Sequence, residues 1–303
     1  MAWHNNYANE WEEIILAVAR AINREPFMIE KDVVQSMFLY QLAQEDASYV
    51  FKGGTSLSKA YGIIDRFSED IDISMDHKPT VGQRKKSKTD ILSVADKLGF
   101  ELKNAEDIQS RRDFNRYYFS YQSILDDTAM EFIVETSYMH PVFPSSKMLV
   151  NSFVGNYCKD NQINLPVPFD AINTTMLIQS LERGLIDKVF AICDYMLKNR
   201  QERNSRHLYD IAKILPHITV DKSLYRLINE VRNERMTSQN NPSAQPEYDI
   251  SNLLEEIIKN HYFENDYNTV TKKILYEDIS YDKAIKEGIE KIAAMNMFAY
   301  QRP

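Results

Sequence analysis

The chain has 303 residues, of which 44% are hydrophobic and 26% are charged, and its formal net charge is −8. This size suits one large domain or two ordinary ones. No stretch approaches the ~18 consecutive apolar residues that cross a membrane, the first residues lack a secretory signal pattern, and Cys158 and Cys193 form no metal-like cluster. These features argue against a membrane protein and predict a cytoplasmic one. The net charge does not exclude nucleic-acid binding, because local patches decide that contact.

Short helical and strand-like patterns surround a double glycine near the start of the chain. Apolar positions at three- and four-residue spacing predict helices within residues 10–47. The run YVFK (49–52) reads as a short strand. After the glycines, Thr55 or Ser56 can cap a helix that runs to about Tyr61.

Strand patterns dominate the next part of the chain. DIDISM (70–75) alternates acidic and apolar residues as a strand does. Residues 76–90 are polar and basic, which predicts a loop that opens into a helix near 88–98. FNRYYFSYQS (114–123) and AMEFIVETSY (129–138) are typical of a strand pair.

The second half is mainly helical. LERGLIDKVFAICDYMLK (181–198) and SRHLYDIAKIL (205–215) have strong helical periodicity, and residues 233–249 read as an exposed loop. We therefore expect an α+β fold, in which a small mixed sheet flanked by helices precedes a largely helical C-terminal half. The expected boundary near residue 170 separates a core of residues 1–170 from a helical region of residues 171–303.

The acidic strand carries the clearest chemistry. Residues two apart in a strand point the same way, so Asp70 and Asp72 share one face while Ile71 and Ile73 share the other. Neighbouring carboxylates repel each other, and a divalent cation removes that repulsion. Mg²⁺ usually takes one or two carboxylates together with substrate phosphates and water. A solvated strand face with no cation is the alternative.

The double glycine favours the cation. Three of the eight glycines in the chain, Gly53, Gly54 and Gly62, lie within ten residues of each other. A Gly-Gly turn between a strand and a helix offers backbone N–H groups and a helix N-terminus to a phosphate. Since the phosphate-binding patterns G-x-x-x-x-G-K-[ST] and G-x-G-x-x-G are both absent, the pattern predicts metal-assisted nucleotide chemistry of another kind.

The segment FKGGTSLSKAYGIIDRFSEDIDI (51–73) resembles the AbiEii/AbiGii toxins among the DNA polymerase β-like nucleotidyltransferases. Three further segments are similar to motifs of that family, and Asp187 stands where the family usually has Glu. They are FMIEKDVV (27–34), VETSYMHPVFPSS (134–146) and LIDKVFAICDYMLKNRQERNSRHLYDIAKIL (185–215). The similarity covers most of residues 27–220, with a weaker tail near 262–295.

The resemblance implies site residues beyond the acid pair. Lys188 matches the motif lysine, which would neutralise triphosphate charge, and Asp210 would be a general base or a metal partner. From the residues alone, Lys188 reads as a lysine that extends to solvent and Asp210 as a partner of Arg206. A third carboxylate is expected on a neighbouring strand. Glu135 matches the third motif better than Glu131.

The glycine segment would bind the nucleotide. The resemblance implies nucleotide-binding roles for Gly53, Gly54 and Thr55, while Arg66 and Ser68 would shape the loop before the acidic strand, with Arg66 also in reach of a phosphate.

The reaction implied by the resemblance is nucleotidyl transfer. Asp70 and Asp72 would hold Mg²⁺ or Mn²⁺ on an NTP, a hydroxyl would attack the α-phosphorus, and pyrophosphate would leave. The family is one of toxins in toxin–antitoxin and abortive-infection systems, so a cognate antitoxin and an RNA acceptor, with tRNA as a candidate, are the expected partners.

Two basic runs, QRKKSK (83–88) and SRRDFNRYY (110–118), are candidate RNA contacts, with Tyr117 and Tyr118 stacking on bases; solvated charged faces are the alternative. A non-catalytic nucleotide- or RNA-binding regulatory module of the same fold is the alternative function.

Overall fold

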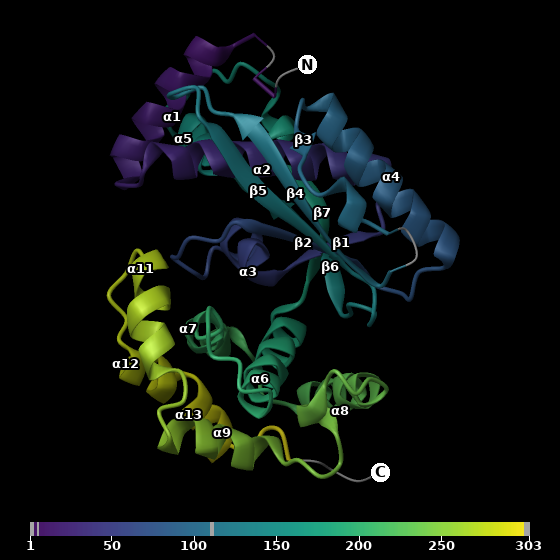
Figure 1. The fold of residues 1–303 in the computed structure, drawn as a ribbon. Coiled ribbons are helices and arrows are strands. Elements are labelled where there is room, and N and C mark those ends of the chain that lie inside the picture. Colours follow the sequence, from purple (N-terminus) through teal and green to yellow (C-terminus); the bar gives the residue numbers. More distant parts are fainter. Residues whose placement is uncertain (1–2, 5, 110–111, 300–303) are drawn as a thin grey trace. The chain divides into compact units, whose positions relative to one another are not determined.

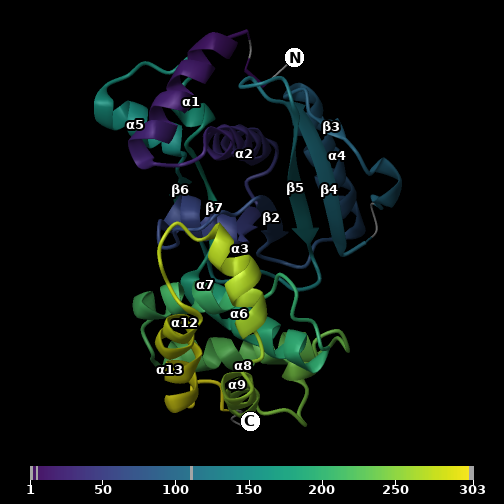
Figure 2. The same ribbon diagram turned by 60° about the vertical axis from the view of Figure 1, so that its left-hand side comes forward.

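The computed structural model has a mixed α/β fold, as the sequence predicts (Figures 1 and 2). It describes residues 3–4, 6–109 and 112–299. The chain divides into two compact units, of which the first is Met1–Gly62 with Ser68–Gln179 and the second is Ile63–Phe67 with Ser180–Pro303. The five residues 63–67 therefore belong to the second unit, although they precede the acidic strand in sequence.

A seven-stranded mixed sheet forms the centre of the first unit, with strand order β3-β4-β5-β2-β1-β7-β6. The strands are β1 (Tyr49–Lys52), β2 (Asp70–Met75), β3 (Glu101–Leu102), β4 (Phe114–Gln122), β5 (Ala129–Ser137), β6 (Ser145–Val150) and β7 (Thr174–Gln179). The acidic strand β2 pairs antiparallel with β1 and parallel with β5, so it lies in the middle of the sheet.

Helices bury one face of this sheet. They are α1 (Ala8–Ile22), α2 (Pro26–Glu45), α4 (Val81–Lys97) and α5 (Phe153–Asn161), while the short α3 (Gly53–Ser56) directly follows β1 and contacts β2. Figure 1 shows α1, α2 and α5 packed together and α4 next to β3. The apolar side chains of β2 face this core, because Ile71 and Ile73 are fully buried. Phe38 of α2 lies 6.0 and 5.8 Å, between ring centroids, from Phe119 and Phe132 of the sheet.

Several boundaries in the first unit differ from the expectations. Helix α4 begins at Val81, well before residue 88, because Thr80 and Gln83 form a reciprocal capping box. The helix after the double glycine begins at Gly53 itself, so Thr55 lies inside it and caps nothing.

The first unit also extends beyond residue 170. Strands β6 and β7 were not expected, and β7 pairs with β1 inside the sheet. The first unit therefore ends at Gln179.

The second unit is helical. Its helices are α6 (Leu181–Leu197), α7 (Arg206–Ile214), α8 (Lys222–Met236), α9 (Ile250–Lys259), α10 (Glu264–Asp266), α11 (Lys272–Ile274), α12 (Tyr281–Glu287) and α13 (Ile289–Ala294). The exposed loop expected at 233–249 is found only in part. Residues 237–249 are mostly irregular, but α8 continues to Met236, and Ser243 is fully buried and donates its N–H and hydroxyl to Asp194. No described helix is long and apolar enough to cross a membrane.

Candidate active site

The acid pair sits on the sheet face opposite the buried isoleucines. Strand β2 alternates as expected, with Ile71 and Ile73 in the core and Asp70 and Asp72 partly exposed on the other face. In the ladder, Asp72 lies beside Lys52 of β1 and Glu135 of β5. The two core isoleucines therefore orient both carboxylates toward one side of the sheet.

The glycine turn packs directly against this acid pair. Gly53 has φ +77°, a left-handed conformation that side chains disfavour. A Cβ atom on Gly53 would lie 1.9 Å from Asp72 Oδ2, which is far inside van der Waals contact. Both the backbone conformation and the space beside Asp72 thus require glycine, and the glycine turn and the acidic strand form a single structural feature.

Hydroxyl groups tie the helix after the glycines to the start of the acidic strand. Thr55 Oγ1 donates to the carbonyl oxygen of Asp70 at 2.5 Å and lies 2.9 Å from Ser68 Oγ. Thr55 is buried, while Gly54 beside it in α3 is partly exposed. Thr55 and Ser68 therefore hold the backbone in place, and the partly exposed backbone of Gly54 is the part open to a ligand.

Glu135 is the carboxylate next to the acid pair. It lies in register with Asp72, whereas the partner of Asp70 is Ile133 and Glu131 lies two residues beyond that. Arg116 of β4 is opposite Glu135 and binds its Oε1 through Nε at 2.6 Å and a terminal nitrogen at 2.5 Å. The position expected for a third carboxylate thus carries an ion-paired Glu135.

The second unit holds Arg66, Lys188 and Asp210 in one cluster. Arg66 binds Asp210 through two parallel hydrogen bonds, Nε to Oδ1 at 2.7 Å and a terminal nitrogen to Oδ2 at 2.8 Å. Lys188 Nζ donates to Asp210 Oδ2 at 2.6 Å. Asp210 is 0% exposed. Lys188 is therefore buried against Asp210, whereas the residues alone suggested that it extends to solvent.

The charges in this cluster set the protonation of Asp210. Burial by itself would raise the pKa of Asp210, but Arg66 and Lys188 outweigh it and hold that pKa well below its ordinary range. Burial lowers the pKa of Lys188, and Asp210 opposes that change. The two cations thus favour the ionised form of Asp210, and its expected role as a general base or metal partner stays a prediction.

His207, next to this cluster, is structural. Burial, together with Lys188 and Arg206, lowers the pKa of His207 well below its ordinary value, which keeps the ring neutral. The ring stacks on Tyr195 with a centroid distance of 5.8 Å.

A cation at Asp70 and Asp72 would need further ligands. In the described residues, no group of three or more His, Cys, Asp and Glu side chains could hold a metal ion on its own. Two carboxylates on one strand face nevertheless fit Mg²⁺ or Mn²⁺, which complete their coordination with substrate phosphate oxygens and water. The donor set therefore suits a cation that binds together with a nucleotide.

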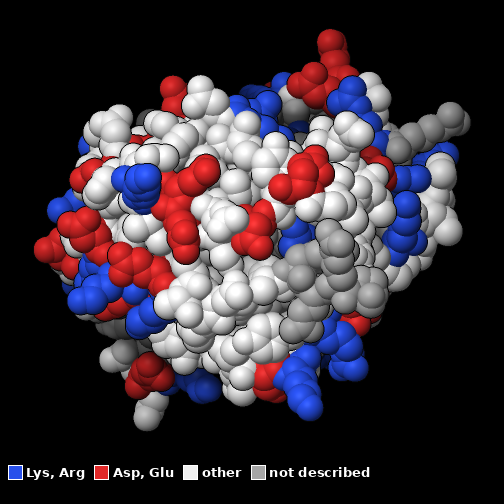
Figure 3. Space-filling model, turned by 90° about the horizontal axis from the view of Figure 1, so that it is seen from below, with Lys and Arg blue, Asp and Glu red and all other residues white. Residues whose placement is uncertain are grey.

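Several side chains of the first basic run bind partners within the protein, and its role as an RNA contact stays a prediction. QRKKSK lies in α4, where Arg84 binds Asp113, Lys86 donates to Asp90 at 2.6 Å and Lys88 donates to the carbonyl of Ile108. On the face shown in Figure 3, acidic side chains gather at the left and centre, and several basic side chains lie along the right-hand and lower edges.

In the second run, Tyr118 is partly exposed and its stacking on a base stays a prediction, whereas Tyr117 is buried. Ser110 and Arg111 lie outside the described residues, and Tyr117 is 1% exposed, so it cannot stack on a base.

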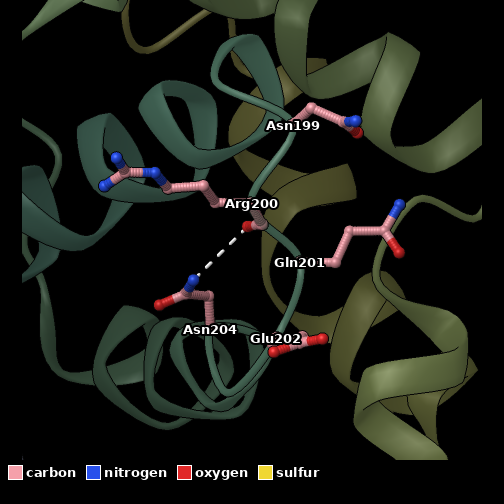
Figure 4. A pocket seen from close by; sticks show the side chains of 5 residues that line it. All are labelled: Asn199, Arg200, Gln201, Glu202 and Asn204. Carbon is pink, nitrogen blue, oxygen red and sulfur yellow. Dashed lines mark hydrogen bonds between the residues drawn. The ribbon is translucent and has the colours of Figure 1, made fainter.

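Two cavities lie away from the expected site residues. The larger, of about 540 Å³, is formed by the α6–α7 connection, and Figure 4 shows Asn204 donating to the carbonyl of Arg200 beside it. The smaller, of about 340 Å³, lies near Cys158 and Phe169 in the first unit. Neither contains a residue expected in the active site, so volume alone does not locate the chemistry.

Sequence reasoning missed two residues with strong contacts in the first unit. Arg116, the partner of Glu135, is visible in the sequence only through the antiparallel register of β4 and β5. Lys59 follows the glycines at a spacing that fits no phosphate-binding loop, yet it is buried and paired with Asp32. The available signal was the charged triplet Glu30–Asp32 inside an otherwise apolar helix.

Comparison with known proteins finds a matching family and several solved structures of low sequence identity. The model of the family described as nucleotidyl transferase AbiEii toxin, type IV toxin–antitoxin system, matches residues 37–291. No curated protein matches. Similar solved structures include JHP933 from Helicobacter pylori (17% identity, 88% of this chain, 90% of that chain, TM-score 0.45). A candidate nucleotidyltransferase from H. pylori is also similar (17% identity, 87% and 92% coverage, TM-score 0.49).

Proposed function

The chain belongs to the AbiEii family of nucleotidyltransferase toxins of type IV toxin–antitoxin systems, and we propose that it transfers NMP from an NTP to RNA, with tRNA as a candidate acceptor. The packing of Gly53 against Asp72 carries this proposal, because it brings a phosphate-binding turn and a cation-binding pair together. A cognate antitoxin would restrain the toxin, as in abortive infection, and the cytoplasm would supply the NTP.

In the proposed reaction, the first unit binds the triphosphate. Backbone N–H groups of the Gly53–Gly54 turn bind phosphate oxygens, and Asp70 and Asp72 hold Mg²⁺ or Mn²⁺. The cation, when bound, neutralises charge that develops on the phosphates. The acceptor hydroxyl attacks the α-phosphorus and pyrophosphate leaves. Glu135 is the third carboxylate next to Asp72, and its pairing with Arg116 holds it in position.

We propose different roles for the three residues of the cluster in the second unit, Arg66, Lys188 and Asp210. Lys188 is the residue that acts on the triphosphate charge, on the strength of its match to the family motif. Asp210 is a positioning residue, because it is fully buried and binds both Arg66 and Lys188. Arg66, held by two hydrogen bonds, keeps the loop before the acidic strand in place.

The test compares Asp72→Asn with the wild type. Each purified protein is incubated with labelled NTP, Mg²⁺ or Mn²⁺, and total RNA, and incorporated label is measured at equal folded concentration. We expect incorporation of label to fall about a hundredfold or more, because Asn binds the cation that neutralises the triphosphate charge more weakly than Asp. Chelation of the metal should have the same effect on the wild type.

Glu131→Gln is the matched control, since it removes a carboxylate from the same face of β5 without touching the acid pair. It should keep wild-type incorporation. Equal incorporation by Asp72→Asn and wild type would contradict the catalytic assignment. RNA or nucleotide binding that survives in both proteins, without incorporation by either, would favour a non-catalytic binding module.

A further inference from the structure

Helix α2 buries polar side chains along with its apolar ones. Lys31, Asp32, Gln35 and Ser36 are each at most 8% exposed. Buried polar groups are costly unless they are hydrogen-bonded. The partners of these four side chains therefore show which segments the helix holds in place.

Asp32 is paired with Lys59, in the helical turn that follows the double glycine. Lys59 Nζ forms an ion pair with Asp32 Oδ1 and donates to the Asp32 carbonyl at 3.1 Å and to Ser36 Oγ at 2.7 Å. An ammonium group has three donors, and all three are used. Asp32 Oδ2 accepts the backbone N–H of Phe153 at 2.9 Å. The pair is thus fully hydrogen-bonded and almost entirely buried.

The same helix also holds the start of the acidic strand. Gln35 Nε2 donates to the carbonyl oxygen of Glu69 at 2.9 Å, and Lys31 Nζ lies 3.5 Å from a carboxylate oxygen of Glu69. Glu69 directly precedes Asp70 in the sequence. Residues 31–36 of α2 therefore contact two segments: the helical turn that follows the double glycine, and the residue that precedes the acid pair.

We propose that Asp32 and Lys59 are positioning residues for nucleotidyl transfer, which fix the glycine turn relative to the acid pair by holding the helix after the glycines on α2. This inference rests on the proposed function, in which the triphosphate binds that turn and a cation binds that pair. Because desolvation offsets the attraction in a buried ion pair, such a pair adds little to stability compared with apolar residues of similar volume. Replacing both charges therefore separates positioning from folding.

The experiment uses the double variant Asp32→Leu with Lys59→Met in the full chain. We measure kcat, KM for the NTP and KM for the RNA acceptor, together with the thermal unfolding midpoint. We expect kcat/KM for the NTP to fall roughly tenfold to a hundredfold, as displacements of about 1 Å do. KM for the acceptor should stay near wild type, and the unfolding midpoint should fall only modestly, because Asp32→Leu also removes the acceptor of the Phe153 N–H. A purely structural pair would change the amount of folded protein and leave the kinetic constants unchanged.

The matched control is Asp194→Leu with Arg235→Met, which removes a similarly buried pair, 2.7 Å apart, from the second unit. It should keep wild-type KM for the NTP. If the first double variant does not fold, Gln35→Met replaces it and should raise that KM roughly fivefold through loss of one hydrogen bond.

The two proposals fail in different ways. If the wild type transfers nucleotide but the folded Asp32 and Lys59 double variant has unchanged kinetic constants for the NTP, the positioning role is wrong. The same holds for unchanged constants in Gln35→Met, if that variant is used because the double variant does not fold. A wild type that neither binds nor transfers any NTP would overturn the proposed function, and the positioning role with it.

Discussion

Gly53 meets two separate demands, one from its backbone and one from its neighbour. Its φ of +77° favours glycine, and Asp72 Oδ2 occupies the place of a β-carbon. Gly62 has a similar φ of +65° but nothing within 4 Å of its own β-carbon position. Substitutions at the two glycines can therefore be compared: both introduce backbone strain, but only the one at Gly53 also introduces a clash with the acid pair.

We predict that Gly53→Ala abolishes nucleotidyl transfer while Gly62→Ala does not. Gly62→Ala should lower the free energy of unfolding by about 1–2 kcal/mol, because it places alanine in the left-handed region. Gly53→Ala should lower it by more, because its β-carbon also clashes with Asp72. Gly53→Ala alone should also displace Asp72 and reduce incorporation of label into RNA about a hundredfold. Equal activity in the two variants would show that the close packing at Asp72 is not needed.

Helix α2 illustrates how an element can be fixed by polar contacts inside a core. Glu30 is fully buried and accepts hydrogen bonds from Ser123 Oγ and the Ile124 N–H, both at 2.8 Å. These contacts hold the turn between β4 and β5 against the helix. Burial raises the pKa of Glu30 above its ordinary value, and the two hydrogen bonds only partly oppose this.

We predict that the contribution of Glu30 to stability decreases as pH rises. A group whose pKa is higher in the folded state stabilises the fold most below its unfolded pKa, and this contribution is lost as pH rises through the folded pKa. Glu30→Gln, which is neutral at every pH, lacks this dependence. Denaturant unfolding of both proteins from pH ~4 to ~8 measures the difference. A difference that stays constant over this range would contradict the raised pKa.

At the scale of the whole molecule, the two units are not consecutive in sequence. Residues 63–67 belong to the helical unit. Arg66 there binds Asp210, the N–H of Phe67 donates to the carbonyl of Ile274 at 2.8 Å, and the N–H of Tyr276 donates to the carbonyl of Asp65 at 3.0 Å. The helical unit thus depends on a segment that is encoded inside the nucleotide-binding motif.

We predict that a fragment of residues 180–303 does not unfold cooperatively by itself. It lacks Arg66, which leaves the buried Asp210 without its two-bond partner. In the full chain, Arg66→Met should lower the free energy of unfolding by about 3–5 kcal/mol for the same reason. Calorimetry of the fragment and of the variant tests this. A fragment with a sharp transition near that of the full chain would refute it.

The sequence by itself determined the family, the acidic strand and the glycine turn. These features are local: alternation in β2 needs only residues 70–75, and the glycines lie within a few residues of each other. Helix and strand periodicity also located most elements, because each must bury one apolar face.

Only the tertiary structure decided which polar side chains meet. The bonds from Arg66 to Asp210 span 144 residues, the bond from Lys59 to Asp32 spans 27, and the register that places Glu135 beside Asp72 joins two strands far apart in sequence. Likewise, β6 and β7 are recognised as strands by their pairing in the sheet and not by a pattern in their own sequences. Burial of charge depends on such distant partners, since a buried carboxylate or ammonium is stable only when the fold brings its counter-ion to it.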